Sequence, residues 1–398
     1  MRARKFAGRV RSYAARRARA LLGDEENLRA AQQKIAEKNE RMVRLREQLS
    51  NKEREISRLR SRVGEGQTNA ASSVETGMPV FFIIGFAKSG TSWLMRTLNY
   101  HPEILCTGEG LFFGRGADLD QRRGTVAPSS LYGVFADSEH LRAWLQKSAW
   151  TRGDDPEEHI TNLTHTAIDY VFGQKLDRTG GARKWIVGDK TPFVSEETIE
   201  EIERIYPGAK VIHIIRDGRD VAVSAVHHMW NHAVDAGGHL TVSPEELETR
   251  DAYRRDPETF RADGRSLFDE GRLRNGFARS WYDMTTRAIE DGPRLLGKNY
   301  TEVRYEDLLE RPVEETRRLL AFLGADAGEE AAKKCVDAAS FETWTKGRER
   351  GKEESTAFLR KGVAGDWKES FTEADKRVFK EVTGDLLIRL GYEKDGGW

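Results

Sequence analysis

Four short apolar runs in the second part of the chain alternate with longer stretches of helical periodicity. The runs read VFFII at 80–84, KWIVG at 184–188, KVIHII at 210–215 and YTEVRY at 300–305. Buried parallel strands have this continuous apolar character because helices cover both faces of their sheet. The pattern predicts an α/β fold of three layers, with a parallel sheet flanked by helices. Residues 231–280 interrupt the alternation with glycines and many charged residues, and we predict there an exposed helical excursion, either a lid or a solvated insertion.

The first part of the chain has a different pattern. From Leu28 to Val63 an apolar residue recurs at every seventh position, and Gly and Pro are absent. This heptad spacing predicts a coiled coil over residues 23–63, through which the chain forms a homo-oligomer. The second seam position is apolar over only part of its length, because it includes Lys38 and Lys52. A single charged helix therefore stays as the alternative.

Two further segments flank the heptads. Residues 1–22 carry eight Arg and Lys residues and no acidic residue. They predict a basic amphipathic helix, which is either a peripheral contact for an anionic membrane surface or a solvated tail. Residues 64–78 are small and polar and predict a linker. The α/β domain then occupies residues 79–398.

Charge and composition narrow the classes of function. The chain has 65 Lys and Arg against 65 Asp and Glu, and this balance disfavours a dedicated nucleic-acid binder. Only two cysteines are present, Cys106 and Cys335, too few for a disulfide framework or a zinc cage. We find neither an apolar run of about 18 residues nor a secretory pattern, so we expect a cytoplasmic location. The spacing of His, Cys and Asp suggests no metal site.

The first apolar run continues into a loop bounded by two glycines, so that a strand at 80–84, a loop at 85–90 and a helix from Thr91 follow one another. Backbone N–H groups at such a junction bind anions, and we expect a phosphate-like group over residues 88–92. Nucleotide hydrolases place lysine directly after the second glycine, whereas here the lysine is Lys88, inside the loop. The arrangement is P-loop-like, but the displaced lysine argues against an ATP-dependent small-molecule kinase, which stays as an alternative.

Several segments resemble the sulfotransferases that use 3′-phosphoadenosine 5′-phosphosulfate (PAPS). GFAKSGTSWL at 85–94 resembles their 5′-phosphosulfate loop, and KVIHIIRDGRDVAVS at 210–224 resembles their 3′-phosphate-binding strand, turn and helix. YTEVRYEDLLERPVEETRRLLAFLG, from residue 300, resembles the segment that follows in the family. RKGVAGDWKESFT at 360–372 is similar to the C-terminal signature of the cytosolic members. The matches follow the family order and cover residues 79–390.

The resemblance implies that the chain binds PAPS and releases adenosine 3′,5′-bisphosphate (PAP), with no metal ion. It implies that Lys88 neutralises the oxygen between the sulfuryl group and the phosphate, that Trp93 stacks on adenine and that Arg216 grips the 3′-phosphate. The implied nucleotide-binding residues are Lys88, Ser89, Gly90, Thr91, Ser92, Trp93, Arg216, Ser224, Tyr305, Ser340, Phe341, Arg360, Lys361 and Gly362.

The acceptor side requires a general base, because the attacking hydroxyl must lose its proton. Cytosolic sulfotransferases supply a histidine from a Lys-Thr-His run, but here Lys190 and Thr191 precede Pro192, which cannot accept a proton. The stretch LNYHPEILCTGEGLFF resembles tyrosylprotein sulfotransferases, in which a Gly-Glu pair supplies a catalytic glutamate, and it points to Glu109. The expected catalytic residues are Lys88, Glu109 and Lys190, with Lys190 contacting the sulfuryl group.

Other groups stay open as the base. Asp189 is the second candidate, although a capping or salt-bridging role is its alternative. Among the histidines, we expect His101 at a helix end and His213 in the core, whereas His227 and His228 are further candidates to face the acceptor. The acceptor itself, whether glycan, lipid, small metabolite or peptide, is not determined. A catalytically dead coiled-coil scaffold is the last alternative, and the intact basic residues of the motifs argue against it.

Overall fold

The computed structural model describes residues 78–114, 130–179, 184–191, 197–234, 240–357 and 359–398. All of them belong to the unit that runs from Gly77 to Trp398. The predicted basic helix, the predicted coiled coil and all but the last residue of the predicted linker lie outside the described residues.

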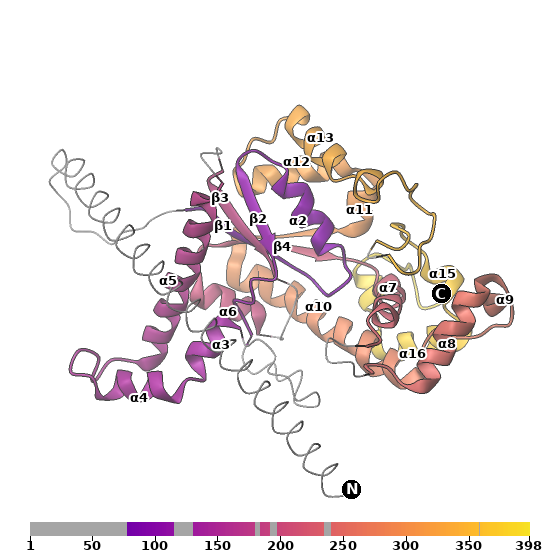
Figure 1. Ribbon diagram of the computed structural model, residues 1–398, viewed down its shortest axis with the longest axis horizontal. Coiled ribbons are helices and arrows are strands. Elements are labelled where there is room, and N and C mark those ends of the chain that lie inside the picture. The colour runs from indigo at the N-terminus through magenta and orange to yellow at the C-terminus, as the bar shows by residue number, and fades with distance from the viewer. Residues whose placement is uncertain (1–77, 115–129, 180–183, 192–196, 235–239, 358) are drawn as a thin grey trace, which may run out of the picture. The chain divides into compact units, whose positions relative to one another are not determined.

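Five parallel strands form one sheet in the order β2-β3-β1-β4-β5 (Figure 1). The strands are β1 (Val80–Ile84), β2 (Ile104–Gly108), β3 (Ile186–Lys190), β4 (Lys210–Ile215) and β5 (Tyr300–Arg304). β1 lies at the centre, and all five of its residues are buried, as its apolar run predicts. The parallel sheet of the predicted α/β fold is thereby confirmed.

Alternate residues of β1 point into two different cores. Phe82 packs on one side with α3 (Leu131–Ala136), α5 (Pro156–Asp177) and α6 (Thr198–Ile205), and Phe81 packs on the other side with α2 (Thr91–Asn99) and α12 (Pro312–Leu323). Figure 1 shows the same arrangement, with α13 (Glu329–Ala338) on the side of α2 and α12. Because both faces are covered, the described domain has the three predicted layers.

The helices and helical turns of the described residues have the following bounds. They are α2 (Thr91–Asn99), α3 (Leu131–Ala136), α4 (Glu139–Lys147), α5 (Pro156–Asp177), α6 (Thr198–Ile205), α7 (Gly218–Asn231), α8 (Pro244–Arg255), α9 (Pro257–Ala262), the π-helical η1 (Arg272–Arg279), α10 (Ser280–Asp291), the π-helical η2 (Gly292–Leu296), the 3₁₀ turn η3 (Gly297–Asn299), α11 (Tyr305–Glu310), α12 (Pro312–Leu323), α13 (Glu329–Ala338), α14 (Phe341–Trp344), α15 (Trp367–Ser370), α16 (Glu373–Thr383) and α17 (Leu386–Arg389). None of the helices in the described ranges has the length and apolarity needed to cross a membrane.

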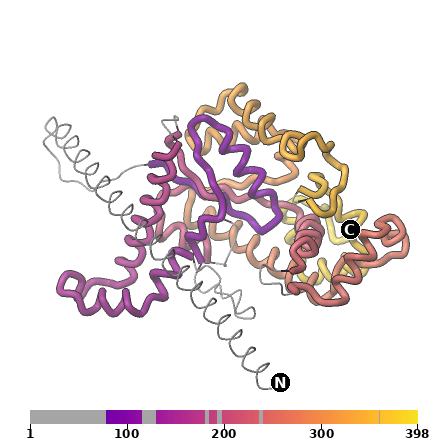
Figure 2. Tube along the Cα trace, viewed as in Figure 1, coloured from indigo at the N-terminus to yellow at the C-terminus, as the bar shows by residue number. Residues whose placement is uncertain are grey.

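The prediction for residues 231–280 is wrong in one respect. Its described residues are mostly helical, as expected, but they are not an exposed insertion. Tyr253, Phe260 and Leu273 are buried and form a third core with α7 and α16, at the end of the molecule where the chain also terminates (Figure 2). Its many charged residues hid this core in the sequence, because they separate the apolar positions that pack together.

Candidate active site

All five parallel strands end at the same edge of the sheet, and a predicted site residue closes or follows each one. Lys88 lies in the loop after β1, Glu109 follows β2, Lys190 ends β3, Arg216 follows β4 and Tyr305 follows β5. These residues line a common cavity of about 470 Å³. Open α/β sheets bind their ligands at this edge, so the topology brings together residues that are up to 217 positions apart.

The loop between β1 and α2 is shaped around its glycines. Lys88 and Gly90 have positive φ angles of 72° and 97°, and a Cβ added at Gly90 would lie 2.6 Å from Cδ2 of Tyr305. Gly90 is the N-cap of α2 and provides no side-chain hydrogen bond. The N–H groups of the first turn are therefore not satisfied by a side-chain cap, which suits an anionic ligand.

Two lysines and one carboxylate meet beside this loop. Nζ of Lys190 lies 2.5 Å from Oε1 of Glu109, and the Lys190 side chain is only 6% exposed whereas that of Glu109 is 65% exposed. Burial, followed by the charges of Arg216 and Lys190, lowers the pKa of Lys88 to about 8, and the charge of Glu109 opposes this shift. These side chains therefore influence one another's charge, and an anion bound beside the two lysines would favour their protonated forms.

Hydrogen bonds from β3 hold the turn that carries Glu109. The Glu109 N–H donates to the carbonyl of Lys190 at 2.8 Å, and the next N–H, of Gly110, donates to the Asp189 carboxylate at 3.1 Å. Thr191 also donates its hydroxyl to Asp189, at 2.7 Å. Burial raises the pKa of Asp189 to about 6, although these hydrogen bonds oppose it. Asp189, the alternative base, lines a separate cavity of about 660 Å³. Its contact with Glu109 is indirect, through the hydrogen bond from the Gly110 N–H.

Arg216 joins two loops of the site. Its Nη1 donates to the carbonyl of Lys88 and its Nη2 to the carbonyl of Val363, both at 3.0 Å. Its guanidinium carbon lies 4.3 Å from the centre of the Tyr305 ring, a cation–π contact. One side chain therefore links the loop between β1 and α2, called the phosphate loop, to the loop between α14 and α15, called the C-terminal loop.

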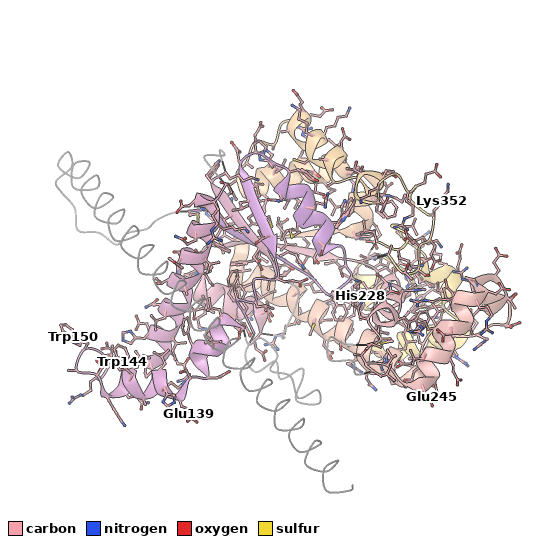
Figure 3. The ribbon with its side chains drawn as sticks, viewed as in Figure 1. Glu139, Trp144, Trp150, His228, Glu245 and Lys352 are labelled. Atoms are coloured by element: carbon pink, nitrogen blue, oxygen red, sulfur yellow. The ribbon has the colours of Figure 1, made fainter. Side chains whose placement is uncertain are left out.

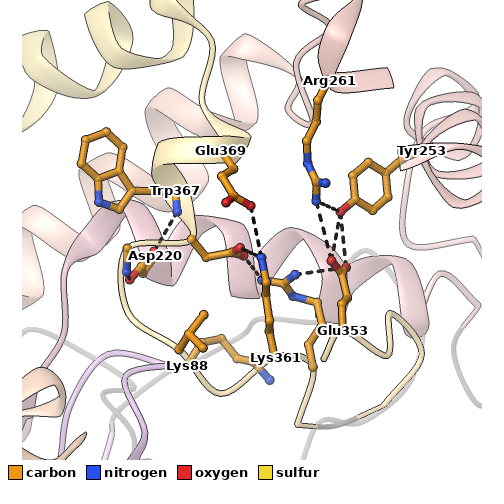
Figure 4. A network of polar contacts seen from close by, with 12 residues as sticks. Lys88, Asp220, Tyr253, Arg261, Glu353, Lys361, Trp367 and Glu369 are labelled. Atoms are coloured by element: carbon orange, nitrogen blue, oxygen red, sulfur yellow. Dashed lines mark hydrogen bonds and ion pairs between the residues drawn. The ribbon is translucent and has the colours of Figure 1, made fainter. Parts of the chain in front are cut away.

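The C-terminal loop presents two more cations, and a buried carboxylate organises them (Figure 4). Asp366 accepts hydrogen bonds from Arg360 and, at 2.6 Å, from Lys361. Arg360 also pairs with Glu353 at 3.0 Å, and Lys361 pairs with Glu369 at 3.3 Å. Both cations line the cavity, so the network holds positive charge at its wall.

Aromatic rings also line the cavity. The Trp93 and Tyr305 rings meet edge to face with centroids 5.6 Å apart, and Phe341 and Trp344 belong to the same lining. The guanidinium carbon of Arg350 lies 5.7 Å from the centre of the Trp93 ring and 5.8 Å from that of Phe341. Flat aromatic surfaces of this kind suit a purine base.

Most of the predicted site residues line this cavity. Glu109, Lys190 and all but two of the predicted nucleotide-binding residues do so. The exceptions are Ser89, whose hydroxyl is buried with no hydrogen-bond partner among the described residues, and Ser340, which caps α14 by accepting from the Thr343 N–H at 3.2 Å. The sequence analysis missed Trp344 and Arg350, which also line the cavity. One signal pointed to Trp344: it follows the predicted site residue Phe341 by about one helical turn.

The four histidines considered in the sequence analysis lie in different surroundings. His101 is buried just after α2, where Nδ1 accepts from the Glu103 N–H at 3.2 Å. His213 is buried on β4, and its Nδ1 lies 2.7 Å from the Tyr300 hydroxyl. His227 points into the third core, whereas His228, its neighbour on α7 (Figure 3), lines the cavity.

The lining residues suit a ligand with several negative charges. The described lining contains the cations Lys88, Lys190, Arg216, Arg350, Arg360 and Lys361 but only one carboxylate, that of Glu109. The cradle at Gly90 has no room for a side chain, and the buried hydroxyl of Ser89 lies beside it. A nucleotide that carries phosphate and sulfate groups therefore fits the chemistry of these residues.

Comparisons with known proteins agree with this composition of the site. The family model described as "Sulfotransferase family" matches residues 79–273, and the one described as "Sulfotransferase domain" matches residues 205–391. Human sulfotransferase 2B1 is 31% identical over 186 residues, which cover 43% of this chain and 42% of that protein. Chicken protein-tyrosine sulfotransferase 2 is 25% identical over 161 residues, or 40% of this chain and 36% of that protein.

The chain thus spans less than half the length of each of these two relatives. Among solved structures, a mouse sulfotransferase complexed with PAP is similar with a TM-score of 0.41 and 19% identity, covering 77% of this chain and 83% of that one. The two family models overlap and together run from residue 79 to residue 391. The chain belongs to the sulfotransferase family.

Proposed function

We propose that this protein is a PAPS-dependent sulfotransferase that transfers a sulfuryl group to an acceptor hydroxyl by in-line attack. One observation carries the proposal. Among the described residues, the phosphate loop, the cations of three other segments and a single carboxylate line one cavity at the carboxyl ends of the strands. PAPS supplies the activated sulfuryl group, and the residues of the chain bind it, orient it and accept the proton of the acceptor.

The proposed binding roles divide the cavity into three regions. Lys88, Ser89, Gly90, Thr91 and Ser92 hold the 5′-phosphosulfate with backbone donors, hydroxyls and one ammonium group. Arg216, Ser224, Arg360, Lys361 and Gly362 hold the 3′-phosphate, for which the bidentate geometry of guanidinium is well suited. Trp93, Tyr305, Ser340 and Phe341 belong to the adenosine region, although Ser340 serves as a helix cap in the described chain.

The proposed catalytic roles follow from charge and access. Lys88 and Lys190 stabilise the negative charge that develops on the transferring group and on the departing phosphate oxygen. Glu109 has one oxygen paired with Lys190, so its second oxygen is available to take the proton of the acceptor hydroxyl. Asp189 supports the turn of Glu109 and is a positioning residue in this scheme.

The remaining parts of the proposal concern the acceptor and the N-terminal segments. A glycan, a lipid, a small metabolite and a peptide are all acceptors with the required hydroxyl. We further propose that residues 23–63 form a homo-oligomeric coiled coil, that residues 1–22 contact a membrane surface peripherally and that the protein works in the cytoplasm. The eight basic residues and the heptad spacing of these segments support this assignment.

Calorimetric titration of the full chain tests the cofactor class. PAP and, in parallel, ATP with magnesium are titrated into the same protein. We expect micromolar binding of PAP and little binding of ATP, because Arg216, Arg360 and Lys361 of the cavity are the proposed partners of a 3′-phosphate, which ATP lacks. Preference for ATP would instead support the kinase alternative, and binding of neither nucleotide would support the scaffold.

Substitution of the proposed base tests the catalytic assignment. Because a general base contributes about 10²- to 10⁴-fold, Glu109→Gln should lower turnover by at least about 100-fold. Its affinity for PAP should not fall, since the substitution removes a negative charge from a cavity that binds an anion. Turnover near that of the wild type would remove Glu109 as the base.

A further inference from the structure

One face of α7, continued by the residue that caps its C-terminus, contributes two histidines to the cavity. Ser224, His228 and His232 are spaced by four residues, so they lie on the same side of the helix, and all three line the cavity. His228 thereby extends the row that begins at a proposed 3′-phosphate residue toward Lys88 and Glu109. None of the proposed roles so far uses it.

The surroundings of His228 leave its ring available for chemistry. The ring packs against that of His232 with centroids 4.3 Å apart, and Nδ1 of His232 donates to the backbone carbonyl of His228 at 2.9 Å. Among the described residues, the imidazole of His228 has no hydrogen-bond partner, and it is only half-buried. His232 is thus held in place by the backbone, whereas the ring nitrogens of His228 are free to meet a ligand.

Burial and the charged groups that face His228 set its protonation. Burial, followed by the charges of Lys88 and His232, lowers the pKa of His228 to about 4, and the charge of Glu109 opposes this shift. The other charged residues of the cavity wall are the cations of β3, β4 and the C-terminal loop. The ring is neutral at pH 7 and can accept a proton. An anion bound against Lys88 offsets that repulsion, which raises the pKa toward its ordinary value and makes the ring a better base at neutral pH.

We propose that His228 is a second catalytic residue, a general base that works in parallel with Glu109. This inference rests on the proposed function. In the step, the acceptor oxygen forms a bond to sulfur, and the bond between sulfur and the bridging oxygen of the phosphosulfate breaks. The electron pair stays on that oxygen, which leaves as part of PAP. The hydroxyl proton passes to a ring nitrogen of His228 instead of to Glu109.

Parallel bases have a recognisable signature in mutant kinetics. If the His228 route supplies about one hundredth of the wild-type rate, His228→Phe alone changes the rate by only about 1%, since the Glu109 route remains. In the Glu109→Gln background, the same substitution removes the remaining route and lowers the rate by a further tenfold or more. The residual rate of Glu109→Gln should rise with pH and then level off as the imidazole loses its proton.

The experiment uses water as the acceptor, because the natural acceptor is not identified. Hydrolysis of labelled PAPS by the full chain is followed as sulfate release for the wild type, the two single variants and the double variant. His228→Asn is made beside His228→Phe in case the larger ring disturbs the fold, and His140→Phe on the exposed surface of α4 is the matched control. PAP affinity is measured for every variant.

Two kinetic outcomes would overturn the inference. A double variant as active as Glu109→Gln shows that His228 takes no proton. A His228→Phe variant that loses as much activity as Glu109→Gln, with PAP affinity retained, shows that the two residues act in series and not in parallel. The expected outcome is a small single effect and a large effect in the Glu109→Gln background.

A titration followed by nuclear magnetic resonance tests the same point without turnover. The ring signals of His228, assigned by their loss in His228→Phe, are titrated with and without saturating PAP. We expect the pKa of His228 to rise when PAP is bound, and an unchanged or lower value would contradict the inference. If PAP does not bind at all, the proposed function itself fails, so the two failures are distinguishable.

Discussion

Binding of PAP should be accompanied by uptake of a proton at Lys88. Burial, Arg216 and Lys190 lower the pKa of the Lys88 ammonium to about 8, so at pH 8 it carries its proton in about half of the free molecules. A phosphate bound against this side chain favours the charged form and raises the pKa well above 8. Uptake should therefore approach about 0.5 proton per site at pH 8 but only about 0.1 at pH 7.

Calorimetry in buffers of different ionisation enthalpy measures this number directly. A pH of 8 lies well above the ordinary pKa of imidazole and above the second pKa of a phosphate group, so Lys88 dominates the exchange. Lys88→Arg is the matched control, because a guanidinium keeps the charge but does not titrate. We expect the uptake at pH 8 to vanish in this variant while PAP still binds. Equal uptake by the wild type and by Lys88→Arg would refute the assignment of the proton to Lys88.

Three more outcomes follow from individual side chains. Gly90→Ala should destabilise the protein by about 2 kcal/mol, because the residue has φ +97° and its new methyl group meets the Tyr305 ring; thermal unfolding checks this. Asp366→Asn should cost about 2–4 kcal/mol in urea unfolding, since the buried carboxylate pairs with two cations, whereas Glu369→Gln, at a 66% exposed carboxylate, should cost less than about 1 kcal/mol. Burial raises the pKa of Asp189 in the folded protein from its ordinary value of 3.8 to about 6, so the stability that its protonated form contributes is present at pH 4 and is lost as the pH rises through 6; the unfolding free energy of the wild type should fall relative to Asp189→Asn over this range.

Central strands were predictable because burial on both faces leaves a continuous apolar run. β1 and β4 have the predicted bounds, and each is almost wholly buried. β2 at Ile104–Gly108 was missed, since it is an edge strand whose last two residues are exposed. β3 was expected two residues too early, because Trp185 extends its apolar run although the residue itself is 44% exposed. Edges of the sheet therefore limit what an apolar pattern can predict.

Site residues that are contiguous in the chain were easier to find than those that the fold brings in singly. The phosphate loop and the segment around Arg360 each place several lining residues in one short motif. Arg350 reaches the cavity from a loop with many other charged residues, and charge alone does not distinguish a residue that lines a cavity from one that faces solvent. Tertiary contacts, such as its approach to Trp93 and Phe341, identify it.

The sequence identified His227 and His228 as candidates to face the acceptor, but it could not show which of the two lines the cavity. Counted from Ser224, they are three and four residues on, which places them about 60° and 40° to either side of it at 3.6 residues per turn. Both are therefore compatible with the face that Ser224 marks. The third core decides between them, because Trp230 and Tyr253 pack around His227 and leave His228 toward Lys88 and Glu109. That core was itself hidden among charged residues, so the choice of histidine depended on the part of the fold that the sequence pattern had predicted wrongly.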